Sequence, residues 1–289
     1  MIPANFNYHK ASSVKEAIAL STELGEEAKY MSGGHSLLPM MKLRFATPEH
    51  IIDISKIEGL SYIKEDGDML KIGALTTQTE MEHNTLLKEN YPIMGDAIHL
   101  TADPSIRNLG TIGGNIAHGD AANDQPSLMI AMRATIIAEG SGGTKQIPID
   151  EFFHGFYMTA LEPGDILTEI QIPKAKKNSG GAYYKTERKV GDYATAGVAV
   201  HLELDNDGVC QQVGIGLTNV NAVPMRLERG EGVLRGNKIT DELIAQVGQI
   251  ASEDCEPESD LRGSEAYKRS IINTITKRML NKALERARQ

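Results

Sequence analysis

The segment YMSGGHSLLPMMKLR, from Tyr30 to Arg44, places two adjacent glycines between a short apolar run and a longer apolar stretch. Glycine is used where a chain needs a positive φ, or where its backbone must approach another group without a Cβ in between. Successive backbone N–H groups in such a loop can point into one concavity that favours anions. The sequence therefore predicts an anion-binding loop at residues 32–36.

A second Gly-Gly step occurs in TIGGNIAHGDAANDQP, from Thr111 to Pro126. Two anion-binding loops in one domain suit a diphosphate, with one loop on each side of the bridge, and so indicate a dinucleotide. The chain has no G-x-G-x-x-G between a first strand and helix and no G-K-[ST], which excludes the Rossmann and P-loop arrangements. We expect valine at Gly33 or Gly114 to abolish binding, because a branched side chain would intrude on the phosphates.

Three potential metal ligands lie close together in the second loop, at His118, Asp120 and Asp124. Metal ligands of these types usually sit at regular helical or strand spacing, with a distant further partner. This run is loop-like, and Asp124 is equally suited to hydrogen-bond the hydroxyl groups of a ligand. We therefore expect no metal here.

The bulk composition narrows the class of protein. The chain has 289 residues, 40% hydrophobic and 24% charged, which is enough for two folded domains. Its net charge of −9 argues against a nucleic-acid partner. Only Cys210 and Cys255 are present, so this chain alone cannot ligate an iron-sulfur cluster with four thiolates. The N-terminus lacks the apolar region of a signal peptide, and we expect a cytoplasmic protein.

Periodicity and breaker residues predict the order of elements in the first part of the chain. A capping box at Ser13–Glu16 begins a helix that ends at Gly25, and a hairpin turns at Asp66-Gly67. A helical pattern covers Thr77–Leu100. Buried strands are expected at 28–31, 50–54, on both sides of 140–143, and at 164–173.

The polar, glycine-containing stretch KAKKNSGG at 174–181 is the best linker in the chain, and places a domain boundary near residue 176. Beyond it, an antiparallel sheet with a turn at Asp207-Gly208 is expected. Helices are predicted at Asp241–Ser252 and from about Ser264 onward.

Four segments, GGHSLLPMMKLR, ADPSIRNLGTIGGNIAHGDAANDQP, YYKTERKVGDYATA and CEPESDLRGSEAYKR, together resemble the FAD-binding medium subunits of molybdenum hydroxylases, most closely those of aerobic carbon monoxide dehydrogenases. The resemblance covers the whole chain. It implies an α+β fold with a vanillyl-alcohol-oxidase-type FAD-binding domain at 1–176, divided into two α/β subdomains at about 1–56 and 57–176. A smaller domain at 177–289 would combine a three-stranded antiparallel sheet with a helical bundle.

The resemblance also implies a noncovalent FAD site, position by position. Residues 32–36 and 111–115 would hold the diphosphate and ribityl region, Asp124 a ribityl hydroxyl, and Leu167 the surroundings of the adenine. Lys185, Asp192 and Tyr193 would lie near the isoalloxazine. The full set is Ser32, Gly33, Gly34, His35, Ser36, Leu37, Thr101, Ala102, Thr111, Gly113, Gly114, Asn115, Asp124, Leu167, Lys185, Asp192 and Tyr193.

Thr101 departs from the pattern of the family. The family generally has an aliphatic side chain at this position, which is expected to shield the flavin face opposite the tyrosine. A threonine is smaller and more polar, which bears on the reactivity of the flavin more than on its binding.

The resemblance implies an electron-transfer flavoprotein. Substrate would be oxidised at a molybdopterin cofactor on a large subunit, and two [2Fe-2S] clusters on a small subunit would deliver electrons to FAD in this chain. The flavin would pass them to an external acceptor such as a quinone, NAD or oxygen. The complex would be a dimer of heterotrimers, cytoplasmic or associated through its partners with the inner face of the membrane.

Several alternatives stay open. The similarity favours carbon monoxide as the substrate of the complex, but a purine, an aldehyde or an N-heterocycle would also be oxidised on the partner chain. A self-contained FAD oxidoreductase and a non-catalytic nucleotide-binding module are the other two classes. Neither a histidine context for covalent flavin attachment nor a poised acid and base supports the self-contained enzyme.

Overall fold

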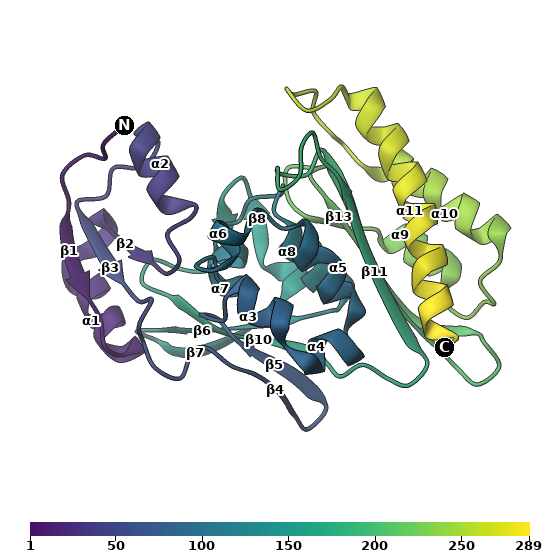
Figure 1. Cartoon of the computed structure of the whole chain (residues 1–289), viewed down its shortest axis with the longest axis horizontal. Coiled ribbons are helices and arrows are strands. Elements are labelled where there is room, and N and C mark those ends of the chain that lie inside the picture. The colour runs from purple at the N-terminus through teal and green to yellow at the C-terminus, as the bar shows by residue number, and fades with distance from the viewer.

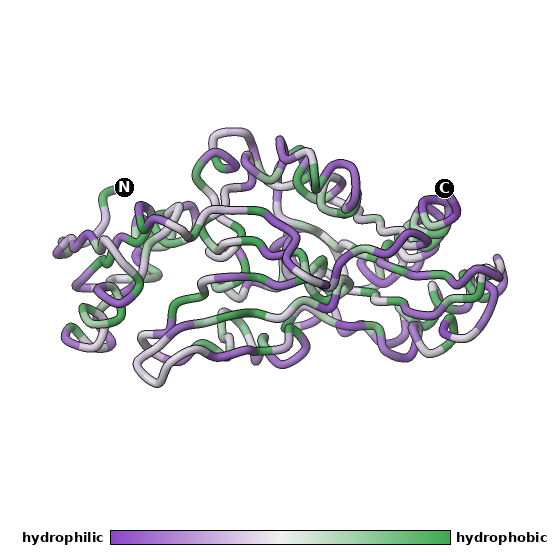
Figure 2. Tube along the Cα trace, turned by 90° about the horizontal axis from the view of Figure 1, so that it is seen from below, coloured by the Kyte–Doolittle hydropathy of each residue, from purple (hydrophilic) through white to green (hydrophobic).

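The computed structural model describes residues 1–289, which form three units in a row along the long axis of the molecule (Figure 1). We call them the N-terminal unit (residues 1–56), the middle unit (57–176) and the C-terminal unit (177–289). Each unit is built on its own sheet. The perpendicular view of Figure 2 shows the same row, with the N- and C-termini at opposite ends.

The N-terminal unit is a three-stranded parallel sheet in the order β1-β3-β2. Its elements are β1 (Asn7–Lys10), α1 (Val14–Leu24), a 3₁₀ turn (Gly25–Glu27), β2 (Ala28–Met31), α2 (Leu37–Leu43) and β3 (His50–Asp53). The first Gly-Gly loop leaves the carboxyl end of β2, the edge at which parallel sheets with helical crossovers bind ligands. The sequence did not predict β1, because its residues are largely exposed and show no apolar alternation.

Helix α1 begins and ends where the sequence predicts. The Ser13 hydroxyl accepts a hydrogen bond from the backbone N–H of Glu16, and Gly25 ends the helix with a φ of 67°. The Glu16 carboxylate accepts from the backbone and hydroxyl of Ser12 and not from Ser13. Only half of the predicted capping box is therefore formed.

The middle unit is a five-stranded antiparallel sheet in the order β4-β5-β10-β6-β7. The strands are β4 (Ile63–Asp66), β5 (Met69–Gly73), β6 (Thr135–Gly140), β7 (Gly143–Pro148) and β10 (Ile166–Pro173). The predicted hairpin at Asp66-Gly67 and the strand pair around 140–143 are confirmed. The unit also contains α6 (Pro104–Arg107), α7 (Ile112–Ala117), α8 (Asp124–Ala131), a 3₁₀ turn (Ile149–Glu151) and the pair β8 (Phe153–Gly155) and β9 (Met158–Thr159).

The segment Thr77–Leu100 is helical, as predicted, but it is divided into three helices. The segment forms α3 (Gln78–His83), α4 (Thr85–Asn90) and α5 (Pro92–Leu100). Asn84 ends α3 in an extended conformation and caps α4, accepting from the N–H of Leu87. Pro92 cannot donate a hydrogen bond to the preceding turn, and it therefore starts α5.

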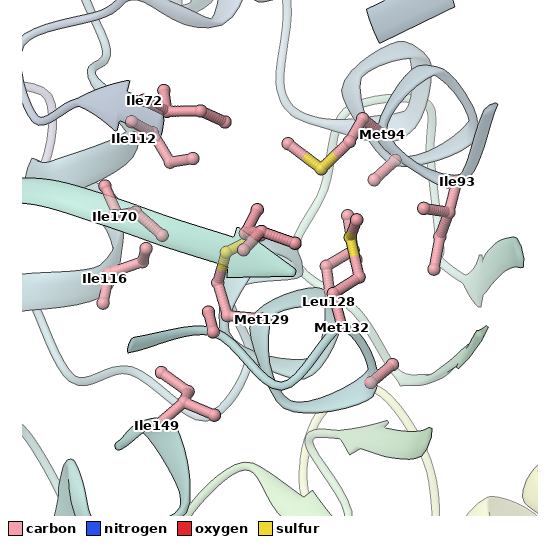
Figure 3. Packing of buried hydrophobic residues seen from close by; sticks show 14 of the residues in the cluster. Ile72, Ile93, Met94, Ile112, Ile116, Leu128, Met129, Met132, Ile149 and Ile170 are labelled. Atoms are coloured by element: carbon pink, nitrogen blue, oxygen red, sulfur yellow. The ribbon is translucent and has the colours of Figure 1, made fainter. Parts of the chain in front are cut away.

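The core of the middle unit fixes α7 on the sheet. Ile112 and Ile116 of α7 lie against Ile72 of β5 and Ile170 of β10 (Figure 3), and all four are fully buried. Because α7 also carries the second Gly-Gly step, this packing holds the second loop at a defined place above the sheet.

The C-terminal unit is an antiparallel sheet in the order β11-β12-β13-β14. Its strands are β11 (Ser179–Thr186), β12 (Ala196–Leu204), β13 (Cys210–Thr218) and β14 (Met225–Arg226), with helices α9 (Glu228–Leu234), α10 (Asp241–Asp254) and α11 (Glu265–Ala287). The sheet has four strands, which corrects the expected three. The added strand is only two residues long and pairs with Gly216 and Leu217, too short to give a pattern in the sequence. None of the helices combines the length and apolar composition that crossing a bilayer requires.

An ion cluster ties the middle unit to the last helix. Asp96 of α5 accepts hydrogen bonds from Arg286 at 2.6 and 3.1 Å and from Lys282 at 3.0 Å, both on α11. Arg286 also donates to the backbone carbonyl of Gly181 in β11. Burial by itself raises the pKa of Asp96, but these hydrogen bonds more than offset it and hold the pKa below its ordinary value.

We expect Asp96→Asn to destabilise the chain at neutral pH, and the destabilisation to shrink in acid. A carboxyl whose pKa is lowered by folding contributes stability above its unfolded-state pKa, here 3.8, and loses that contribution as the pH falls through the lower folded-state value. Urea unfolding of the native chain and the variant, from neutral pH to about pH 3, measures the difference. A difference that stays constant over this range would contradict the assignment.

Candidate functional site

One cavity of about 990 Å³ gathers all seventeen residues that the sequence analysis selected. Its wall is shared by the three units: residues 21–54 of the N-terminal unit, residues 74–167 of the middle unit, and four residues of the C-terminal unit. The two Gly-Gly loops, which are far apart in the sequence, therefore meet at the same site. A cavity of this size accommodates a ligand larger than a single nucleotide ring system.

The first Gly-Gly loop presents a run of free backbone donors. None of the six backbone N–H groups from Ser32 to Leu37 donates to a backbone carbonyl of the chain. Gly34 adopts a φ of 72°, a conformation that residues with a Cβ rarely take. Six unpaired amides in one cavity wall are donors that an anionic group could use, so the anion-binding role of this loop stays a prediction.

The second Gly-Gly loop differs from the prediction. Its amides are already paired: Gly113 N–H donates to Ala74 O, Gly114 N–H to Thr111 Oγ1, and Asn115 N–H to Thr111 O. The expected second set of free N–H donors is therefore wrong for these three residues, because the Ala74 carbonyl and the cap residue Thr111 accept from N–H groups that the first turn of a helix often leaves free. This loop offers side chains instead. Thr111 Oγ1 lies 3.1 Å from Ser32 Oγ, and Asn115 Oδ1 is buried without a hydrogen-bond partner.

Gly33 and Gly114 allow the two loops to approach each other closely. Their lack of a side chain matters more for this approach than for leaving space for a ligand. A Cβ added at Gly33 would lie 2.0 Å from the backbone oxygen of Leu109, and one at Gly114 would lie 2.7 Å from Ser32 Oγ. A side chain at Gly33 is thus expected to disturb the site for a different reason than the predicted clash with a ligand phosphate. The first obstacle at Gly33 is the backbone of the middle unit, so this glycine sets how closely the two loops approach.

Lys185 and Asp124 form a buried ion pair in the cavity wall. Lys185 Nζ lies 3.0 Å from Asp124 Oδ2 and donates to the backbone oxygen of Asp192 at 2.8 Å. The second carboxylate oxygen of Asp124 accepts from the hydroxyl of Tyr183 at 2.6 Å. Burial raises the pKa of Asp124, while the charge of Lys185 and the hydroxyl of Tyr183 act in the opposite direction. Asp124 therefore has fewer acceptor positions left for a ligand than the sequence implied.

Tyr193 lies at the cavity wall with 42% of its surface exposed. The guanidinium of Arg262 lies 5.7 Å from its ring centroid, within the range of a cation–π contact. Arg262 and Arg188 both bind the Asp192 carboxylate. Burial alone would raise the pKa of Asp192, but these hydrogen bonds lower it below its ordinary value.

Thr101 satisfies its polarity inside the protein. Its hydroxyl donates to the Ala97 carbonyl of the same helix at 2.8 Å. The next residue, Ala102, has a φ of 49°, which is strained for a residue with a Cβ. Thr101 is therefore less polar toward the cavity than its residue type suggests.

The histidines of the cavity have different surroundings. His35 Nε2 is buried and has no hydrogen-bond partner in the chain, which leaves it available to a ligand. His118 packs on Tyr157, with 4.9 Å between the ring centroids, and burial lowers its pKa. No group of three or more His, Cys, Asp or Glu side chains is arranged to hold a metal ion.

The residues at one end of the cavity were not predicted from the sequence. Tyr30 donates its hydroxyl to the backbone oxygen of Gly164 at 3.0 Å, and so joins the N-terminal unit to the turn before β10. The end of α1 and this turn line the cavity there, with Ser21, Thr22, Gly25, Glu26, Glu162, Pro163, Gly164, Asp165 and Ile166. The Pro163-Gly164-Asp165 sequence is a turn signature that could have indicated a loop at this place. The whole cavity suits an extended ligand with an anionic group at the unpaired amides and a flat group near Tyr193.

Two family models match the chain. One, described as the FAD binding domain in molybdopterin dehydrogenase, matches residues 4–175, and the other, the CO dehydrogenase flavoprotein C-terminal domain, matches residues 181–283. The chain is 45% identical over 286 residues to the carbon monoxide dehydrogenase medium chain of Hydrogenophaga pseudoflava, covering 99% of each. It is 33% identical over 288 residues to the 6-hydroxypseudooxynicotine dehydrogenase complex subunit alpha of Paenarthrobacter nicotinovorans, covering 100% of this chain and 97% of the relative.

Comparison with a solved structure shows that the chain has the fold of the same family. The chain superimposes with a TM-score of 0.96, at 45% identity and with 99% of each chain covered, on a chain of the carbon monoxide dehydrogenase of Hydrogenophaga pseudoflava that lacks the Mo-pyranopterin moiety of the molybdenum cofactor. The order of elements described above is thus that of a known two-domain FAD-binding fold.

Proposed function

The chain belongs to the family of FAD-binding medium chains of carbon monoxide dehydrogenases and related molybdenum hydroxylases, and from this premise we propose how its cavity serves an oxidoreductase. FAD binds in the cavity shared by the three units, noncovalently, in a domain of the vanillyl-alcohol-oxidase type. The observation that carries the proposal is the meeting of all seventeen selected residues at one cavity with six unpaired amides.

Each group of residues has a role in holding FAD. The amides of residues 32–37 and the buried nitrogen of His35 bind the diphosphate, the Thr111 hydroxyl binds an adjoining ribityl or phosphate oxygen, and Asn115 Oδ1 accepts from a ribityl hydroxyl. Leu167 lies beside the adenosine half. Lys185, Asp192 and Tyr193 lie around the isoalloxazine, with Thr101 and Ala102 near its other face. When bound, FAD supplies chemistry that accepts single electrons and donates a pair.

The electrons come from outside this chain. The family pairs medium chains with molybdenum and iron-sulfur subunits, and the two cysteines, Cys210 and Cys255, are both buried. Burial raises the pKa of the Cys210 thiol to about 11, so it is protonated at neutral pH, and two cysteines fall short of the four thiolates that a [2Fe-2S] cluster needs. A large molybdenum subunit would oxidise the substrate, a small [2Fe-2S] subunit would pass the electrons to FAD, and an external acceptor such as a quinone would receive them, in a dimer of heterotrimers.

Carbon monoxide is the substrate that we propose for the complex. The identity to a carbon monoxide dehydrogenase medium chain is 45%, against 33% to the subunit named for 6-hydroxypseudooxynicotine. The second relative supports the alternative, a complex that oxidises an N-heterocycle or another organic substrate. We further propose a domain division at residue 176, in line with the ends of the two family matches.

Purification of the native complex tests the proposal. The complex should contain this chain with two partner subunits, FAD, molybdenum and iron, and carbon monoxide should bleach the flavin absorbance in the absence of an acceptor. A flavin-containing complex that is bleached by an organic substrate and not by carbon monoxide would favour the alternative. A preparation with FAD but neither molybdenum nor iron would contradict the assignment to an electron-transfer subunit.

A further inference from the structure

Lys185 shares its ammonium group between two buried carboxylates. Its Nζ lies 3.0 Å from Asp124 Oδ2 and 3.5 Å from Glu187 Oε2, and the three side chains are 1%, 7% and 14% exposed, in the order Lys185, Asp124, Glu187. We call these residues the Lys185 cluster. With two carboxylates and one ammonium, the cluster carries one formal negative charge that is almost withdrawn from water, which is unfavourable.

Glu187 is the less satisfied member of the cluster. Asp124 accepts one hydrogen bond from Tyr183 and one from Lys185. Glu187 Oε2 is buried and has no hydrogen-bond partner, so its contact with Lys185 is an ion pair only. A proton on one of the two carboxylates would remove the excess charge and give that carboxyl a donor. The cluster therefore has a place for one proton.

The guanidinium groups nearest the cluster bind Asp192 and neither Asp124 nor Glu187. Asp192 contributes its carbonyl oxygen, while its carboxylate is bound to Arg188 and Arg262. The strands opposite Lys185 contribute Gly197 of β12 and, beyond it, Thr218 of β13. The remaining titratable or polar neighbours on α5, α8, β11 and the adjoining loops are Thr101, Asp120, Tyr183 and Tyr193.

We infer that the Lys185 cluster binds one proton from solvent when the flavin is reduced and returns it when the flavin is reoxidised. The inference rests on the proposed function, since it requires FAD beside Lys185. Electrons that enter the cavity bring negative charge next to a cluster that is already negative, and a nearby like charge favours the protonated form of a carboxyl. Two electrons come from the iron-sulfur partner, and the additional proton comes from water and binds a carboxylate of Asp124 or Glu187. No bond other than O–H forms or breaks in this step.

Glu187 is a positioning residue in this scheme. It does not line the cavity, whereas Asp124 and Lys185 do. It acts through Lys185, by sharing the ammonium with Asp124 and by supplying the second negative charge. Glu187→Gln keeps the shape of the side chain, removes that charge and leaves one carboxylate for one ammonium.

The test is the two-electron midpoint potential of the bound FAD as a function of pH, in the native complex and in a complex with Glu187→Gln. Each proton bound per two electrons lowers the potential by about 30 mV per pH unit. We expect the slope of potential against pH to be smaller in the variant by the contribution of one proton, about 30 mV per pH unit. We also expect the variant to have the higher potential wherever the cluster of the native protein is unprotonated. Glu203→Gln is the matched control, because Glu203 is a Glu of the same sheet that pairs with Lys176 and lies outside the cavity.

Equal slopes in the native complex and Glu187→Gln would overturn the inference, as would an equal effect of Glu203→Gln. If Glu187→Gln does not assemble, infrared difference spectra of the native complex decide: reduction should produce the C=O band of a protonated carboxyl, and its absence would overturn the inference. The flavin absorbance of the native complex is recorded first. A complex without FAD would overturn the proposed function together with the inference, whereas bound FAD with an unchanged slope would overturn the inference alone.

Discussion

Gly33→Val is expected to remove FAD from the purified chain, with a loss of affinity on the order of 100-fold or more. A Cβ at this position would meet the Leu109 carbonyl oxygen at 2.0 Å, a distance that no adjustment of a side chain relieves because the obstacle is backbone. The first loop must therefore move away from the middle unit, and its six amides move with it. A misplacement of about 1 Å in a site can cost on the order of 100-fold. The flavin-to-protein absorbance ratio and titration with added FAD measure the effect.

Gly95→Ala is the matched control for this variant. Gly95 lies in α5, a Cβ there would meet nothing within 4 Å, and its φ is not positive. The control should bind FAD as the native chain does. Retention of FAD by Gly33→Val at the native level would contradict the assignment of the first loop to the ligand.

Glu231→Gln is expected to destabilise the chain by about 3–5 kcal/mol, the usual cost of breaking a buried ion pair. Glu231 of α9 is 1% exposed and binds Arg226 through three hydrogen bonds between 2.8 and 3.1 Å. It also accepts from Arg133 of the middle unit and from the backbone N–H of Ile215. An amide cannot satisfy these donors, so Arg133 would lose its only carboxylate partner and Arg226 would keep only Asp150 within hydrogen-bond distance, at 2.6 Å. The midpoint of urea unfolding measures the loss.

Glu228→Gln tests whether the loss of stability in Glu231→Gln arises because Glu231 is buried. Glu228 is in the same helix and also lies near Arg226, but at 3.9 Å and with 77% of its side chain exposed. Exposed pairs of this kind contribute little, so the control should unfold within about 0.5 kcal/mol of the native chain. Similar losses in the two variants would show that Glu231 does not have the central role that its contacts indicate.

Turn and cap residues predicted much of the fold, because the turns and ends that they form depend only on neighbouring residues. The hairpin at Asp66-Gly67, the helix that ends at Gly25 and the strand that ends at Pro173 each depend on residues within a few positions of one another. The helical pattern predicted at 77–100 did not show that the segment divides into three helices, for a reason of the same kind. Its average pattern is helical, but Asn84 and Pro92 impose breaks that an average over the segment hides.

The sequence selected residues that line one cavity, but it did not indicate which hydrogen bonds they make. Glycine pairs and a family resemblance selected residues that line one cavity, yet the sequence did not indicate that the amides of the second loop are already paired. That outcome depends on Thr111 capping α7 and on Ala74 lying beneath Gly113. The roles of Tyr183 and Glu187 were also beyond the sequence, because each depends on side chains from other elements converging on Lys185 and Asp124.

The cavity wall is shared by three units, each with its own sheet, so a ligand bound there acts as a cross-link between them. A ligand that binds only the folded chain stabilises it by RT ln(1 + [L]/Kd), about 2.7 kcal/mol at a hundred times the dissociation constant. In a cell that is short of flavin, a larger fraction of this chain would then be unfolded and accessible to proteases. The amount of the subunit that survives to be assembled would follow the supply of flavin, without any dedicated regulator.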